Sequence, residues 1–253
     1  MIYDDGGTAK NYRQNGVNFT INYINLYKNL KKNFGSGELD IIYMIDSTGS
    51  MSGWIKGVKD KCKEILDKLN ENIKLKNYDI KFGGVFYRDP IDSSSDKHEF
   101  QPLGNVENLK IKMMSISAYG GGDEPEDWAG GYEIALDTTK MNWRMKSIKI
   151  IIHIADAGAH GQRFSNGDKY NEYEAKLVNL INICAKREIS IFGYQIGSNP
   201  EKSFNECKNI YDSIKSKDCY FEIYHFEHAS DKDVAEKLKE NITNHISAFI
   251  AKK

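Results

Sequence analysis

Four nearly continuous apolar runs, separated by long polar intervals, constrain most strongly what this chain of 253 residues can fold into. A strand that is covered on both faces buries all of its side chains, whereas a strand with one wet face alternates apolar with polar residues. The runs therefore predict parallel strands in the middle of a sheet. They are Leu39–Ile45, Tyr78–Tyr87, Ile148–Ile154 and Ile189–Ile196.

Weaker patterns complete the predicted fold. Cys219–Phe226 alternates and predicts a further strand, and the short, half-polar segment His98–Leu103 is typical of an edge strand. Apolar residues recur at helical spacing in Trp54–Ile73, Leu177–Ala185 and Val234–Phe249. Strands that alternate with helices predict an α/β fold. We expect a doubly wound, open, mostly parallel sheet with helices on both faces and a short antiparallel edge strand.

Residues 1–36 differ from the rest of the chain, because Asn, Lys and Tyr dominate them. Phe19, Tyr23, Tyr27 and Leu30 recur at helical spacing within this segment. We interpret residues 1–36 as a helical N-terminal extension and residues 37–253 as one large α/β domain, a length that suffices for a substantial core.

Charge and hydropathy exclude several classes of protein. The chain has 35 basic and 36 acidic residues, a balance that disfavours nucleic-acid binding. No apolar run approaches the roughly 20 residues that a membrane-spanning helix needs. The first residues, Met-Ile-Tyr-Asp-Asp, are acidic where a secretory signal would be basic and then apolar. We therefore expect a cytoplasmic protein with no membrane span.

The segment Asp46-Ser47-Thr48-Gly49-Ser50 directly follows the first buried run and precedes a helical pattern. In an open α/β sheet, ligands bind beyond the carboxyl ends of the strands. The Asp46 carboxylate and the Thr48 and Ser50 hydroxyls occupy alternate positions, so one tight loop can direct three oxygens at one point. Hard cations such as Mg²⁺ prefer such oxygens. Alternatively, Ser50 or Ser52 only caps the helix, which leaves Asp46 at the end of a buried run unexplained.

Asp46, Thr48 and Ser50 match the D-x-[S/T]-x-S signature of the metal-ion-dependent adhesion site in von Willebrand factor A domains. Tyr119–Asp127 resembles the second metal loop of that family, and Ala155–Gly158 resembles the third. The resemblance covers residues 38–250 and implies the family's fold with one bound divalent cation. That cation would be Mg²⁺, or Mn²⁺ or Ca²⁺ in its place. The ligands that the resemblance implies are Asp46, Thr48, Ser50, Asp123 and Asp156.

A narrower resemblance is carried by Tyr87-Arg88-Asp89, by the Gly-Gly-Asp-x-Pro-Glu-Asp loop and by Asp156–Gly161. These segments are similar to the A domains that accompany atypical alpha-kinases. The sequence contains no Gly-rich phosphate loop and no kinase signature, so the resemblance does not carry kinase activity over to this chain.

Five further polar residues are expected beside the ligands, where they could contact the ligands or a bound partner. They are Ser47, Asp89, Glu124, Glu126 and His160. Each has an alternative role. Glu124 and Glu126, together with Asp127, can stabilise the start of the helix that follows Pro125. Asp89 can form a salt bridge that fixes the loops, and His160 can be an exposed loop histidine.

The resemblance implies a binding module whose protein partner completes the metal shell with an acidic side chain. Three carboxylates from Asp46, Asp123 and Asp156 would bind the ion firmly but weaken its attraction for an external acid. One alternative is a metal-dependent hydrolase or phosphotransferase, for which only Ser47 and His160 could act as nucleophile or base. Another is a scaffold with a structural metal. The sequence favours the binding module over an enzyme.

Overall fold

The computed structural model describes residues 12–14, 17–19, 37–56, 64, 66–67, 78–226, 240 and 244. Within the range 78–226, residues 92, 94, 96, 123 and 217 are not described. The chain divides into two compact units, residues 1–37 and 38–253. In the first unit, β1 (Tyr12–Gln14) and β2 (Val17–Phe19) form an antiparallel pair. Phe19, the first residue of the predicted helix, lies in β2 instead, and the rest of that helix lies outside the described residues.

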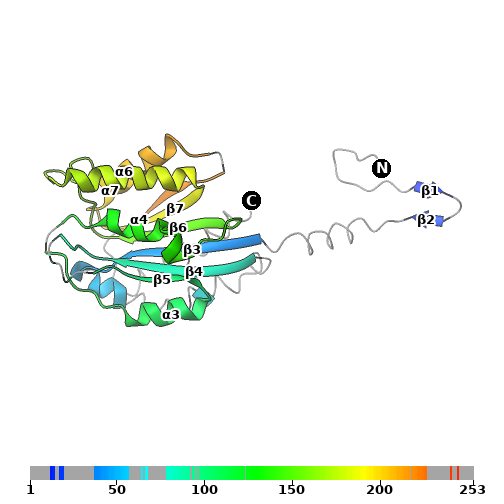
Figure 1. Ribbon diagram of the computed structural model, residues 1–253, viewed down its shortest axis with the longest axis horizontal. Coiled ribbons are helices and arrows are strands. Elements are labelled where there is room, and N and C mark those ends of the chain that lie inside the picture. The colour runs from blue at the N-terminus through cyan, green and yellow to red at the C-terminus, as the bar shows by residue number, and fades with distance from the viewer. Residues whose placement is uncertain are drawn as a thin grey trace. The chain divides into compact units, whose positions relative to one another are not determined.

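The second unit is built on a six-stranded sheet (Figure 1). Its strands lie in the order β5-β4-β3-β6-β7-β8. Their bounds are β3 (Gly37–Asp46), β4 (Tyr78–Tyr87), β5 (Glu99–Gly104), β6 (Ile148–Ala155), β7 (Ile189–Ile196) and β8 (Phe221–Phe226). All six strands were predicted from the sequence, four of them as the long apolar runs.

The strand pairing confirms a mostly parallel α/β sheet. β6 pairs in parallel with β3 and β7, and β7 pairs in parallel with β8. β5 pairs antiparallel with β4 and lies at the edge, as the half-polar segment predicted. β3 is central, so both faces of its apolar run are buried.

Helices cover both faces of the sheet (Figure 1). One face is covered by α4 (Trp128–Leu136), α6 (Asn171–Lys186) and α7 (Glu201–Asp212). The other face is covered by α3 (Val106–Ser115). The short helix α5 (Thr138–Met141) precedes β6. Of these helices, α6 was predicted from its apolar stripe. For α4, the sequence predicted only that a helix begins after Pro125.

Two further helical predictions fall largely outside the described residues. A short 3-10 helix, η1 (Gly49–Met51), leads into a helix at 52–56, and residues 64 and 66–67 are also helical. These positions belong to the predicted helix Trp54–Ile73. Only residues 240 and 244 of the predicted helix Val234–Phe249 are described, and both are helical.

The core has two layers because successive side chains of a strand point to opposite faces. Along β6, Ile150, Ile152 and Ile154 join the cluster under α3, whereas Ile151 and Ala155 join the cluster under α4, α6 and α7. Burying one such isoleucine side chain contributes roughly 1.5–3 kcal/mol. Within the described residues, no helix is both long and apolar enough to span a bilayer.

Candidate functional site

The first loop of the candidate site leaves β3 at its carboxyl end. Asp46 is the last residue of that strand and is fully buried. Its Oδ1 accepts hydrogen bonds from the Thr48 backbone N–H at 2.9 Å and from Thr48 Oγ1 at 2.7 Å. Thr48 Oγ1 lies 3.3 Å from Ser50 Oγ. The loop therefore gathers three side-chain oxygens in one place, as the alternating spacing predicted.

Asp156 joins this group from the neighbouring strand. The register that pairs Ile45 with Ile154 brings the ends of β3 and β6 to the same edge of the sheet. Ser50 Oγ donates a hydrogen bond to Asp156 Oδ1 at 3.1 Å. Four of the five proposed ligands are thus linked through a chain of hydrogen bonds, although Ser50 and Asp156 are 106 residues apart.

The environment of Asp46 disfavours its charge. Its Oδ2 is buried and has no hydrogen-bond partner among the described residues. Burial and the nearby Asp156 carboxylate raise the pKa of Asp46 to about 7, against the opposing effect of the Thr48 hydrogen bonds. A cation between the two carboxylates would reverse this effect, because it attracts the charged form of both.

Backbone hydrogen bonds join the second loop to the first. The Gly49 N–H donates to the Gly120 carbonyl at 2.9 Å, and the Tyr119 N–H donates to the Ser47 carbonyl at 3.2 Å. Gly121 has a φ of 75° and packs tightly, since an added Cβ would lie 2.6 Å from Glu126 Oε1 and 2.9 Å from Thr48 Cβ. Asp123, the predicted ligand in this loop, lies outside the described residues.

The acids that follow Asp123 have different surroundings. Glu124 is exposed and accepts a hydrogen bond from Asn199 Nδ2 at 2.6 Å. Glu126 is buried, and its backbone N–H donates to the Gly158 carbonyl at 2.8 Å, which ties the second loop to the third. Asp127 caps α4 by accepting from the Gly130 N–H. Asp127, at the helix N-cap, thus has the helix-start role that the sequence suggested for these acids.

Ser47 and Arg88 fix the loops from the side of β4. Ser47 Oγ donates to the Tyr87 carbonyl at 2.8 Å, so this hydroxyl binds the neighbouring strand. The buried Arg88 guanidinium donates to the carbonyls of Lys97 and Ser117. It also lies 3.9 Å from the centre of the Tyr119 ring, a cation–π distance.

His160 occupies a different place from the exposed loop position that the sequence suggested. The residue is only 3% exposed. Its Nε2 lies 2.7 Å from Asp89 Oδ2, and its Nδ1 lies 3.0 Å from Asp168 Oδ2. Burial opposes the charge of His160, but the hydrogen bonds and charges of Asp89 and Asp168 raise its pKa above the usual value. Sequence reasoning missed Asp168, because Ser-Asn-Gly-Asp-Lys reads as an ordinary polar turn.

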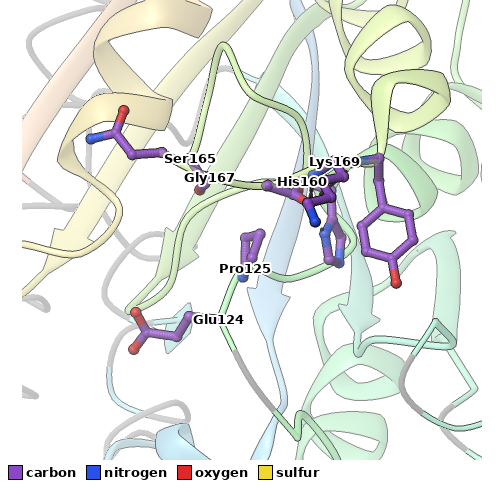
Figure 2. Close-up of a pocket in the computed structure, with 9 residues that line it drawn as sticks. Glu124, Pro125, His160, Ser165, Gly167 and Lys169 are labelled. Atoms are coloured by element: carbon purple, nitrogen blue, oxygen red, sulfur yellow. Dashed lines mark hydrogen bonds and ion pairs between the residues drawn. The ribbon is translucent and has the colours of Figure 1, made fainter.

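A pocket of about 380 Å³ lies beside His160 (Figure 2). Its lining comes from the second loop at residues 124–125 and from the segment 165–170 that precedes α6, together with His160. The pocket therefore adjoins two of the loops that carry predicted metal ligands.

The donor set is suited to a hard cation. Carboxylate and hydroxyl oxygens from Asp46, Thr48, Ser50 and Asp156 are the ligand types that Mg²⁺ and Ca²⁺ prefer. Among the described residues, which exclude Asp123, no group of three or more His, Cys, Asp or Glu side chains could hold a metal. A complete shell would therefore need the hydroxyls and Asp123 as well as the two described carboxylates.

Comparison with known sequences gives two findings. The sequence model of the von Willebrand factor A domain matches residues 40–167, which is half of the chain. Alpha-protein kinase vwkA of Dictyostelium discoideum is 36% identical over 135 residues, which cover 52% of this chain and 20% of the kinase. The chain thus corresponds to about a fifth of that relative's length.

Comparison with solved structures supports the same fold. A pilus adhesin, SpaC of Lactobacillus rhamnosus GG, superposes with a TM-score of 0.56 and 17% identity, over 83% of this chain and 31% of the adhesin. The minor pilin PilB of Streptococcus sanguinis superposes with a TM-score of 0.54 and 12% identity, over 85% of this chain and 62% of the pilin. The proximal thread matrix protein 1 of the mussel byssus superposes with a TM-score of 0.53 and 15% identity, over 84% of this chain and 47% of the matrix protein.

Proposed function

Because the chain belongs to the von Willebrand factor A domain family, we propose that it is a module that binds a protein partner through a divalent cation. The cation, Mg²⁺ first and Mn²⁺ or Ca²⁺ otherwise, is held at the carboxyl edge of the sheet. Its ligands are Asp46, Thr48, Ser50, Asp123 and Asp156.

The observation that carries this proposal is the state of Asp46. A carboxylate that is fully buried, next to a second carboxylate and with one oxygen lacking a hydrogen-bond partner among the described residues, is costly for the fold. A divalent cation removes this cost, because it supplies the missing partner and neutralises both acids. A purely structural role for Asp46 offers no such compensation.

The number of carboxylates affects how the cation is used. With Asp123, three formal negative charges surround one divalent ion, so the ion is firmly bound and draws only weakly on an acid from outside. We propose that a partner acid completes the shell but that surrounding loop residues supply much of the affinity. Tyr119, 42% exposed at the start of the second loop, is suited to this role because tyrosine is enriched among residues that dominate interface energies.

The enzymatic alternative has less support. Ser47 Oγ donates to the Tyr87 carbonyl, and both ring nitrogens of His160 are engaged by carboxylates. The two residues that could act as nucleophile or base are therefore held in other interactions.

The kinase relative suggests a setting for the module. We propose that the domain works in the cytoplasm and recruits a partner to an alpha-kinase, in the same chain or a separate one. The similarity to alpha-protein kinase vwkA over half of this chain supports this setting.

Calorimetric titration of the chelated protein with Mg²⁺, Mn²⁺ and Ca²⁺ tests the site. We expect saturable binding of one ion, which Asp46→Ala abolishes while the circular dichroism spectrum is retained. Asp40→Asn is the matched control, because Asp40 is also a buried carboxylate of β3 but lies at its other end. Unchanged affinity in folded Asp46→Ala would contradict the assignment. A partner pull-down with and without chelator then tests whether the cation matters for recognition.

A further inference from the structure

Three segments that are distant in the sequence meet at His160. Asp89 follows β4, His160 lies on the loop after β6, and Asp168 lies just before α6. The two carboxylates are buried, with side chains 0% and 5% exposed, and they bond to opposite nitrogens of the ring. The rings of Tyr170 and Tyr173 pack against the imidazole at centroid distances of 5.0 Å and 5.7 Å.

Hydrogen-bond partners define the protonation of this histidine. A carboxylate can only accept, so a ring nitrogen that faces one must carry a hydrogen. Both nitrogens of His160 face carboxylates, and His160 is therefore an imidazolium. The His98 ring differs, because its Nδ1 accepts from the Arg88 N–H while its Nε2 faces Asp127. That pair of partners requires only one ring N–H.

We infer that His160 is a positioning residue of the proposed metal site, acting as a charged clasp that fixes the loop carrying Asp156 against the loop after β4. This inference rests on the proposed function, since it assigns His160 a role in metal affinity. His160 does not touch the ion. It acts through the position of Asp156, four residues before it on the same loop.

The charge of the clasp is essential to its strength. Without the imidazolium, Asp89 and Asp168 remain as two buried carboxylates that repel each other, and breaking a buried pair by removing one partner is strongly destabilising. The loop would then be held by weaker contacts, among them the bond from the Ala159 N–H to Ser203 Oγ at 2.9 Å. A loop that moves more freely places Asp156 less well for the cation, and affinity falls.

The variant His160→Gln, measured in the full chain by calorimetric titration with Mg²⁺, tests the clasp. We expect a loss of affinity of roughly tenfold at pH 6.5, the lower end of the range for groups that orient metal ligands. The loss should shrink as the pH rises, because the wild-type imidazolium then loses its own charge.

His98→Gln is the matched control, as it removes a histidine that bonds to one carboxylate at the same edge of the sheet. Its affinity ratio to wild type should not vary with pH. The rings of Tyr170 and Tyr173 also pack against the His160 ring, and burial raises the pKa of Tyr173. Glu124 and Lys169 line the same pocket as His160. Equal Mg²⁺ affinity of wild type and folded His160→Gln at pH 6.5 would overturn the inference.

Hydrogen exchange in chelator separates failure of the clasp from failure of the metal site. His160→Gln should speed exchange of the amides at 156–161, and His98→Gln should leave them protected. If wild-type protein binds no Mg²⁺, the proposed function fails, and with it the role of His160 in affinity. If Mg²⁺ binds but neither exchange nor affinity changes in His160→Gln, only the clasp is refuted.

Discussion

Replacing Asp46 by asparagine should stabilise the protein when no metal is present, although the same change should abolish metal binding. Asparagine keeps an acceptor for the two Thr48 hydrogen bonds and removes the buried charge. The pKa of Asp46 is raised from 3.8 to about 7 by burial and by Asp156. The folded state therefore holds this proton more tightly than the unfolded state does. Stability from this group is present below pH 4 and is lost as the pH rises to about 7.

The size of the effect follows from the shift in pKa. Each pKa unit corresponds to about 1.4 kcal/mol, so the shift amounts to roughly 4 kcal/mol above pH 7. This is an upper estimate, because part of the shift is shared with Asp156. For a domain of this size, 1 kcal/mol changes the melting temperature by about 2–4 °C, so Asp46→Asn should melt up to about 16 °C higher at pH 8.

Thermal unfolding followed by circular dichroism in chelator, at pH 5 and pH 8, provides the measurement. The gain in stability of Asp46→Asn should be large at pH 8 and small at pH 5. Excess Mg²⁺ should raise the melting temperature of the wild type but not of the variant. Equal melting temperatures of the two chelated proteins at pH 8 would refute the reasoning, because Asp46 would then carry its charge without cost.

Three further predictions concern other parts of the fold. Gly121→Ala should lower the free energy of unfolding by about 1–3 kcal/mol more than Gly167→Ala in urea titrations, because both have positive φ but only Gly121 is crowded. His153 is buried between two tyrosine hydroxyls with a pKa well below its usual value, so its stability contribution is lost as the pH falls below 6.5. Between pH 7 and pH 5, the free energy of unfolding should therefore fall by about 1–2 kcal/mol less in His153→Gln than in wild type, as measured by urea unfolding. Arg144→Met leaves buried Asp40 without its cation and should cost roughly 3–5 kcal/mol, measured by urea unfolding, without changing Mg²⁺ affinity.

The sheet could be predicted from the sequence because burial on both faces leaves a local record. Each central strand is a run such as Ile148–Ile154, in which nearly every position is apolar. The helices α3 and α7 have weaker apolar patterns in the sequence. In α7 the buried face includes Ser203, and in α3 it includes Lys110, whose ammonium bonds to Asp67 and Glu107. Polar residues on a buried face obscure the apolar stripe on which helix prediction depends.

The candidate site was predictable where its residues are neighbours in the sequence. Asp46, Thr48 and Ser50 form one loop, so their spacing alone indicated that their oxygens converge. The surroundings of His160 were not predictable in this way. Its partners Asp89 and Asp168 come from two other segments, and a polar residue in a loop reads as exposed unless those partners are known.

The central position of β3 in the sheet also affects how the chain matures during synthesis. β3 emerges early, but its neighbour β6 follows much later, and Ser50 and Asp156 are separated by 106 residues. A ribosome-bound chain that stops before Ile148 lacks Asp156 and cannot form the full set of oxygens. In the proposed site, a divalent ion would therefore stabilise only chains long enough to include β6, and shorter nascent chains would be unaffected. Binding of the proposed cation would then indicate that translation has passed β6, before β7 and β8 complete the sheet.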